Sequence, residues 1–132
     1  MVTVSASKKI LLVDDESGIR RILRIFLEVE GFTVLEAVNA AQAFQVIGEE
    51  QPDLVVLDVI LFGTTGFEVC EKIKSDPKTK RIYVILFTAL NQESDVVEGE
   101  RVGADLYLMK PLNPKEIVKK IKEVLESPSE NL

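Results

Sequence analysis

Short apolar runs alternate with segments of helical periodicity along the whole chain. The runs occupy residues 9–13, 32–35, 53–58, 82–87 and 105–109. Continuous apolar runs of this length are typical of strands that are buried on both faces of a parallel sheet. Five strands that alternate with five helical segments predict an α/β fold in which helices cover both faces of the sheet.

The helical segments carry apolar residues three and four positions apart and have recognisable ends. Ser17 and Asn39 are suited to cap the first two helices. Asn91 or Ser94 is expected to cap the fourth helix, which has the weakest pattern. Pro114 is expected to be the first residue of the fifth helix, because proline is well tolerated there.

Polar side chains stand at the ends of four of the predicted strands. Asp14 and Asp15 follow the first strand, Asp58 closes the third, Thr88 follows the fourth, and Lys110 follows the fifth. The carboxyl ends of parallel strands lie at one edge of a sheet, where such folds bind ligands. With the first strand central and the third beside it, we expect these side chains to share one crevice.

The residue types in this crevice indicate a particular chemistry. Three carboxylates repel one another, and a shared cation relieves that repulsion. The chain has no histidine, so the ligands are oxygen atoms, which favour Mg²⁺ or Mn²⁺. A lysine and a threonine hydroxyl suit the oxygens of a phosphoryl group. Each of these residues alone is more often a helix cap or a solvated side chain. Their combination in one crevice predicts phosphoryl transfer to a carboxylate.

Composition narrows the class of protein. The chain has 132 residues, a formal net charge of −6 and a pI near 4.8. This acidic balance disfavours direct binding of nucleic acid. The apolar run at 10–13 is too short for a signal peptide or a membrane span. The single cysteine, Cys70, rules out an internal disulfide. We expect a cytoplasmic protein with no membrane contact.

Five segments, in their order and spacing, resemble the receiver domains of two-component response regulators. They are Ile10-Leu-Leu-Val-Asp-Asp-Glu16, Pro52-Asp-Leu-Val-Val-Leu-Asp58, Thr88-Ala89, Gly103-Ala-Asp105 and Met109-Lys-Pro-Leu112. The resemblance implies a flavodoxin-like, doubly wound α/β fold. Its five-stranded parallel sheet has the order 2-1-3-4-5, counted along the chain, and five helices complete three α/β/α layers. The domain is expected at 8–126, between an extension at 1–7 and a flexible tail at 127–132.

The resemblance also implies roles for the crevice residues. Asp58 is expected to accept a phosphoryl group and to bind Mg²⁺ together with Asp15 and the backbone carbonyl of Ile60. Asp14 is expected to act on the metal indirectly. Lys110 is expected to pair with the acyl phosphate. The peptide bond between Lys110 and Pro111 is expected to be cis, as in the family. The resemblance implies a histidine kinase or a histidine phosphotransfer protein as the donor. Because the chain contains no histidine, any phosphohistidine must belong to a partner.

A second set of residues is expected to read or tune the phosphorylated state. Thr88 and Tyr107 resemble the switch pair of the family, which alters the surface formed by the last two strands and helices. Ile60 and Leu90 are apolar at places that flank the path of the hydrolytic water. We therefore expect slow autodephosphorylation. The protein is expected to be a signalling switch with self-phosphorylating and weak autophosphatase chemistry, not an enzyme.

The loop after Asp58 departs from the family pattern. Phe62 stands where the family usually has proline, four residues after the acceptor, and Thr64 and Thr65 replace the usual apolar and acidic residues. One interpretation makes Phe62 an exposed anchor for a partner. The other, which we favour, has Phe62 packed against the following helix.

Other functions are less consistent with the residues. A binding-only module of the same fold would not need the intact set Asp14, Asp15, Asp58, Thr88 and Lys110. A flavin-binding electron carrier would need a phosphate-binding loop where two acids stand after the first strand. The output stays open: a target protein, onward phosphate relay, a phosphorylation-dependent dimer, or an effector domain if the chain is part of a longer regulator. A basic edge at Arg20, Arg21 and Arg24 is either a docking surface or a solvated helix face.

Overall fold

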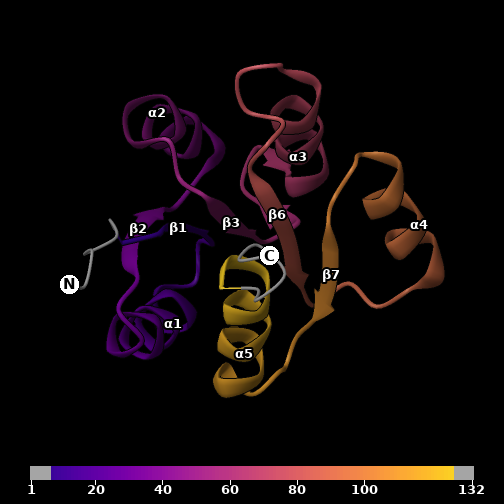
Figure 1. Ribbon diagram of the computed structural model, residues 1–132. Coiled ribbons are helices and arrows are strands. Elements are labelled where there is room, and N and C mark those ends of the chain that lie inside the picture. The colour runs from indigo at the N-terminus through magenta and orange to yellow at the C-terminus, as the bar shows by residue number, and fades with distance from the viewer. Residues whose placement is uncertain (1–6, 127–132) are drawn as a thin grey trace.

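A five-stranded parallel sheet forms the centre of the protein. The computed structural model describes residues 7–126. The strand order is β2-β1-β3-β6-β7, which is the expected order 2-1-3-4-5 along the chain, and it is visible from left to right in Figure 1. The strands are β1 (Lys9–Val13), β2 (Thr33–Ala37), β3 (Leu54–Leu57), β6 (Tyr83–Thr88) and β7 (Leu106–Met109). The predicted strands therefore all exist, with ends shifted by one or two residues.

Helices cover both faces of this sheet, as Figure 1 shows. One face packs against α1 (Ser17–Val29) and α5 (Pro114–Leu125), and the other against α2 (Ala40–Glu50) and α3 (Gly66–Ser75), with α4 (Glu93–Arg101) beside β7. The expected three-layer α/β/α architecture is confirmed. Parallel strands require such crossovers, and the helices bury the apolar residues of each strand face.

Alternate residues of each central strand enter two separate cores. Leu11 and Val13 of β1 pack toward α2 and α3, whereas Ile10 and Leu12 pack toward α1 and α5. All four side chains are at most 1% exposed. This burial on both faces explains why the strands appear in the sequence as continuous apolar runs instead of alternating patterns.

The helix ends confirm some of the predicted signals and correct others. Asn39 accepts a hydrogen bond from the amide of Gln42 and caps α2 as expected, and Pro114 begins α5. Ser17 is not a cap, because Glu16 holds the N-cap position of α1. For α4, the predictions of Asn91 and of Ser94 as the cap were both wrong. Gln92 is the N-cap, and its backbone amide donates to Asp95 Oδ2. Carboxylates three residues into a helix often satisfy the cap amide in this way.

A small hairpin interrupts the path from β3 to α3. Its strands are β4 (Ile60–Leu61) and β5 (Thr64–Thr65), joined through Gly63, whose φ of +84° lies in the left-handed region. The sequence pattern predicted only a turn here. Among residues 7–126, none of the helices combines the length and hydropathy that a membrane crossing requires. The predicted extension at 1–7 and tail at 127–132 lie, except for residue 7, outside the described residues.

Candidate functional site

Backbone hydrogen bonds between strands bring the predicted site residues to one edge of the sheet. The amide of Asp58 donates to the carbonyl of Val13 at 2.9 Å, which sets the end of β3 beside the end of β1. The amide of Lys110 donates to the carbonyl of Thr88 at 2.8 Å, which joins the ends of β7 and β6 in the same way. Sheet register therefore gathers side chains that are far apart in the chain.

Lys110 lies at the centre of the crevice. Its ammonium nitrogen is 2.8 Å from Asp14 Oδ2, 2.9 Å from Asp58 Oδ2 and 3.2 Å from Glu16 Oε1. The side chains of Asp14 and Asp58 are 7% and 5% exposed, and that of Lys110 is 10% exposed. Ion pairs this deeply buried interact strongly, because little water screens them.

The charges of this group do not balance. Burial raises the pKa of the Asp14 carboxyl, and the nearby Asp58 adds to the effect, although Lys110 and the Glu16 amide donate hydrogen bonds to it. Burial alone would lower the pKa of Lys110, but its hydrogen bonds to Asp14 and Asp58 outweigh this and raise the pKa. One ammonium group thus faces three carboxylates, so a second cation would relieve the remaining repulsion.

The acidic oxygens that lie together belong to Asp14, Glu16 and Asp58, with one oxygen from each within 4.8 Å of the others. An all-oxygen, all-carboxylate donor set fits a hard divalent cation such as Mg²⁺. Asp15 is exposed beside this group and is not part of it. The amide of Ile60 donates to Asp58 Oδ1 at 3.1 Å, so Ile60 adjoins the group. The role expected of its backbone carbonyl stays a prediction.

Two residues at the site were not assigned to it from the sequence. Glu16 joins the acidic group, and the only signal for it was its place in the run Asp14-Asp15-Glu16. Arg20 donates to the carbonyl of Asp14 at 2.6 Å and pairs with Glu36 at 2.9 Å, so it holds the end of β1 against β2. The sequence pattern placed Arg20 only on the basic edge of the first helix, and no sequence signal indicated its contact with Asp14.

Thr88 and Tyr107 are joined through the backbone of one residue. The amide of Leu90 donates to the hydroxyl oxygen of Thr88 at 3.4 Å, and the hydroxyl of Tyr107 donates to the carbonyl of Leu90 at 2.9 Å. Thr88 is fully buried. The ring of Tyr107 lies over Gly99 of α4, where an added Cβ would come within 2.9 Å of it. The pair predicted from the sequence is therefore in indirect contact.

The loop beyond Asp58 differs from the interpretation that we favoured. Phe62 does not pack against α3: it is 90% exposed at the tip of the β4–β5 hairpin. The reason is that Leu61, at 8% exposed, occupies the space toward the core. Gly63 then turns the chain back, and the two-residue strands give the tip side chain no neighbouring surface.

Comparison with known proteins agrees with this geometry. A family model described as the response regulator receiver domain matches residues 10–122. The chain belongs to the response-regulator receiver family. Receiver domains bind Mg²⁺ at an acidic pocket, and this receiver brings Asp14, Glu16 and Asp58 together in an acidic group.

Curated relatives of this receiver are transcriptional regulators. It is 44% identical over 118 residues to the phosphate regulon transcriptional regulatory protein PhoB of Pseudomonas aeruginosa. The matched stretch covers 89% of this chain and 52% of that protein. It is 40% identical over 122 residues to the transcriptional regulatory protein ResD of Bacillus subtilis, covering 92% of this chain and 50% of that protein. The chain thus spans about half the length of these relatives.

Solved structures show the same fold over nearly the whole receiver. A response regulator receiver domain protein (CheY-like) from Methanospirillum hungatei superposes with a TM-score of 0.87 at 31% identity, covering 96% of this chain and all of that one. The BeF3-activated DrrB receiver domain superposes with a TM-score of 0.83 at 32% identity, covering 92% and 99%.

Proposed function

We propose that Asp58 of this receiver accepts a phosphoryl group from a phosphohistidine of a partner protein. A carboxylate oxygen of Asp58 forms the new bond to phosphorus, and the bond between phosphorus and the donor imidazole nitrogen breaks. The bonding electron pair stays on that nitrogen, which takes up a proton. The observation that carries the proposal is the position of Asp58, whose carboxylate is buried beside two other acids and the ammonium group of Lys110.

Lys110 and Thr88 are proposed to stabilise the phosphoryl group. The ammonium of Lys110 already contacts Asp58 Oδ2, so a phosphoryl oxygen bound to Asp58 would lie within its reach. The hydroxyl of Thr88 would donate to another oxygen. Fixed donors of this kind stabilise the charge that develops during phosphoryl transfer. Mg²⁺, when bound, offsets the remaining negative charge on carboxylate and phosphoryl oxygens.

The metal-holding residues are proposed in two groups. Asp14, Glu16 and Asp58 supply the acidic oxygens that lie together. Asp15 and the backbone carbonyl of Ile60, which the family resemblance assigns to the metal, adjoin that group. A change of Asp15 to asparagine is expected to raise the Mg²⁺ concentration needed for labelling, because it removes one negative charge at the mouth of the pocket.

The readout is proposed to pass through Thr88, Leu90 and Tyr107. If the Thr88 hydroxyl turns toward a phosphoryl group, its bond with the Leu90 amide changes, and Leu90 also accepts the Tyr107 hydroxyl. This chain of contacts would bias α4 and the neighbouring β7 between two arrangements. The signal would then reach a partner on that side of the molecule.

The partners are proposed from the family and from the names of the relatives. Receiver domains of response regulators interact with kinases and effector domains, and the relatives PhoB and ResD are named transcriptional regulators. We infer a histidine kinase or a histidine phosphotransfer protein as the donor. The output is transcriptional control through an effector domain or a target protein.

The phosphorylated form is proposed to be long-lived. Ile60 is 52% exposed and Leu90 half-buried beside the site, and neither side chain can orient a water molecule for attack on phosphorus. The label on purified, Mg²⁺-replete protein is expected to persist well beyond seconds. Loss of the label within seconds would contradict this part of the proposal.

Labelling by acetyl phosphate tests the central claim. The protein is incubated with acetyl phosphate and Mg²⁺, and intact mass spectrometry measures the gain of one phosphoryl group. Asp58→Asn is expected to abolish the gain, whereas Asp15→Asn, the same chemical change next to the site, is expected to keep it at higher Mg²⁺. Labelling that survives Asp58→Asn would assign the acceptor to another residue.

A further inference from the structure

A cavity of about 730 Å³ lies between α2 and α3, away from the carboxylate crevice. The crevice residues follow the carboxyl ends of the strands, whereas Gln51 and Ile82, which line the cavity, precede β3 and β6. The two sites are therefore at opposite ends of the sheet. The volume is within the range of roughly 300–1,000 Å³ that is usual for small-molecule sites.

Two residues that line this cavity are unfavourable choices for their backbone positions. Gly48 lies inside α2, where glycine is less favourable than alanine, yet a Cβ at this position would meet no atom within 4 Å. Gln51, the C-cap of α2, has a φ of +52°, the left-handed conformation that commonly ends a helix but that glycine adopts at lower cost. Packing does not require a glycine at position 48. The absence of a side chain there keeps the cavity open. Local costs of this kind concentrate at functional sites.

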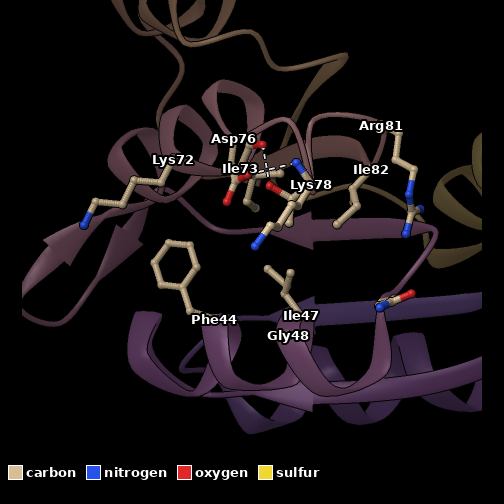
Figure 2. Close-up of a pocket in the computed structure, with 11 residues that line it drawn as sticks. Phe44, Ile47, Gly48, Lys72, Ile73, Asp76, Lys78, Arg81 and Ile82 are labelled. Atoms are coloured by element: carbon tan, nitrogen blue, oxygen red, sulfur yellow. Dashed lines mark hydrogen bonds between the residues drawn. The ribbon is translucent and has the colours of Figure 1, made fainter.

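The cavity combines an apolar floor with a cationic rim. Figure 2 shows Phe44 and Ile47 of α2 facing Ile73 of α3 and Ile82, with Lys78 reaching in between them. Ile47, Ile73 and Ile82 are at most 4% exposed, so the floor belongs to the closed core. The half-buried ring of Phe44 offers a flat apolar surface on the wall.

Three cations surround this floor on a protein whose net charge is −6. Lys72, Lys78 and Arg81 line the cavity, and within the described part of the chain none of them forms an ion pair. The ammonium group of Lys72 lies 5.7 Å from the centroid of the Phe44 ring. The acid of the lining, Asp76, already accepts a hydrogen bond from the amide of Lys78. Three cations and one carboxylate thus line the cavity, so its rim carries a net positive charge.

We propose that the α2–α3 cavity binds a nucleotide, with its flat base against Phe44 and its phosphate held by Lys78 and Arg81. An inorganic phosphate would leave the apolar floor unused, and a neutral ring compound would leave the cations unused. A long nucleic acid would be repelled by the acidic remainder of the surface. The site is separate from Asp58, and the proposal does not depend on phosphorylation.

A titration of the unphosphorylated protein with AMP and with GMP tests the proposal. Amide chemical shifts are recorded in the presence of EDTA, so that Mg²⁺ cannot bridge a nucleotide to the carboxylate crevice. Saturable shift changes are expected at residues 44–51 and 72–82, with adenosine and inorganic phosphate each at least about tenfold weaker than AMP. No saturable change with either nucleotide at millimolar concentration, or changes confined to the carboxylate crevice, would overturn the proposal.

Matched variants separate a built site from general charge attraction. Lys78→Glu with Arg81→Glu is expected to weaken AMP binding by more than about tenfold. Lys115→Glu with Lys119→Glu, the same charge change in another hollow between α1 and α5, is expected to leave the affinity unchanged. Equal weakening by both pairs would overturn the proposal.

A cavity-filling variant keeps the proposal testable if the charge variants fold poorly. Gly48→Leu adds a side chain on the wall of the cavity, where a Cβ would meet no atom within 4 Å. It is expected to raise the melting temperature, because leucine favours the helix. It is also expected to abolish AMP binding. A variant that is more stable and still binds AMP with unchanged affinity would show that the cavity is not the site. Labelling of Asp58 by acetyl phosphate is expected to be unaffected.

Discussion

At the scale of single residues, Gly66, the first residue of α3, packs against the backbone that follows β3. A Cβ at Gly66 would lie 2.2 Å from the carbonyl oxygen of Asp58 and 2.8 Å from the Cα of Val59. The amide of Gly66 also donates to the carbonyl of Val59 at 2.8 Å. The backbone of Asp58 and Val59 can approach α3 this closely only because residue 66 has no side chain.

Gly66→Ala is therefore expected to destabilise the receiver by about 2 kcal/mol or more, because backbone must move to admit the methyl group. Urea unfolding followed by circular dichroism measures the loss. The control is Gly48→Ala in α2, where a Cβ meets nothing within 4 Å, and where alanine is expected to stabilise the helix by roughly 0.5–1 kcal/mol. Equal effects of the two substitutions would contradict the steric argument.

At the same scale, the buried thiol of Cys70 is expected to be unreactive. The thiol is fully buried on α3, and burial raises its pKa to about 12. The thiolate is the reactive form of cysteine. The native protein is therefore expected to resist alkylation by N-ethylmaleimide at mildly alkaline pH, whereas the urea-unfolded protein reacts.

The same pKa shift predicts a pH dependence of stability. Above the ordinary value of 9.0 the unfolded thiol ionises while the native thiol keeps its proton, so the native state binds more protons. Stability is then expected to fall as the pH rises above that value. Cys70→Ala is expected to flatten this part of the curve of unfolding free energy against pH. An unchanged slope in the variant would refute the assignment to Cys70.

At the scale of elements, the β4–β5 hairpin is fixed at its base and exposed at its tip. The Ile60 amide binds the Asp58 carboxylate, and the hydroxyl of Thr65 caps α3 by accepting from the Glu68 amide. Phe62 at the tip is 90% exposed. An exposed aromatic side chain on a fixed support is suited to anchor a partner, and a donor protein that reaches the buried Asp58 must cover this edge of the sheet.

Phe62→Ala is expected to slow phosphoryl transfer from a phosphorylated histidine kinase and to leave labelling by acetyl phosphate unchanged. The small donor does not need the hairpin tip, whereas a protein donor does. Thermal unfolding is expected to be unaffected, because the side chain has few contacts to lose. Val97→Ala, a change of another exposed apolar residue on α4, serves as the control. Equal rates for wild type and Phe62→Ala with the kinase would remove the anchor role.

At the scale of the whole molecule, the crevice and the α4 side are connected through Leu90. Beryllofluoride, the group present in the activated DrrB neighbour, is expected to bind the receiver with Mg²⁺ and raise its melting temperature, since a ligand that binds only the native state stabilises it. Hydrogen exchange is expected to change in α4 and β7 as well. Thr88→Ala is expected to keep part of the thermal shift, since Lys110 and Mg²⁺ still bind the group, and to lose the distant exchange change. If the distant change persists in Thr88→Ala, the proposed route through Thr88 is wrong.

The sequence predicted those parts of the fold that depend on local pattern. Apolar runs located the five strands, Asn39 and Pro114 marked helix starts, and the order of motifs gave the family and the sheet order. It failed where several local signals compete: Ser17, Asn91 and Ser94 are all good cap residues, but Glu16 and Gln92 hold those positions. Cap choice depends on where the preceding loop is held, and for α1 that loop is held by the site.

The sequence by itself determined that Asp14, Asp58, Thr88 and Lys110 stand at strand ends, because each strand stops where its continuous apolar run stops. Only the tertiary structure decided their partners. Lys110 contacts three acids, including Glu16; Arg20 holds Asp14; and Phe62 faces solvent. Strand register, helix approach and the side on which a loop emerges are set by packing between distant segments, and a linear pattern does not encode that packing directly.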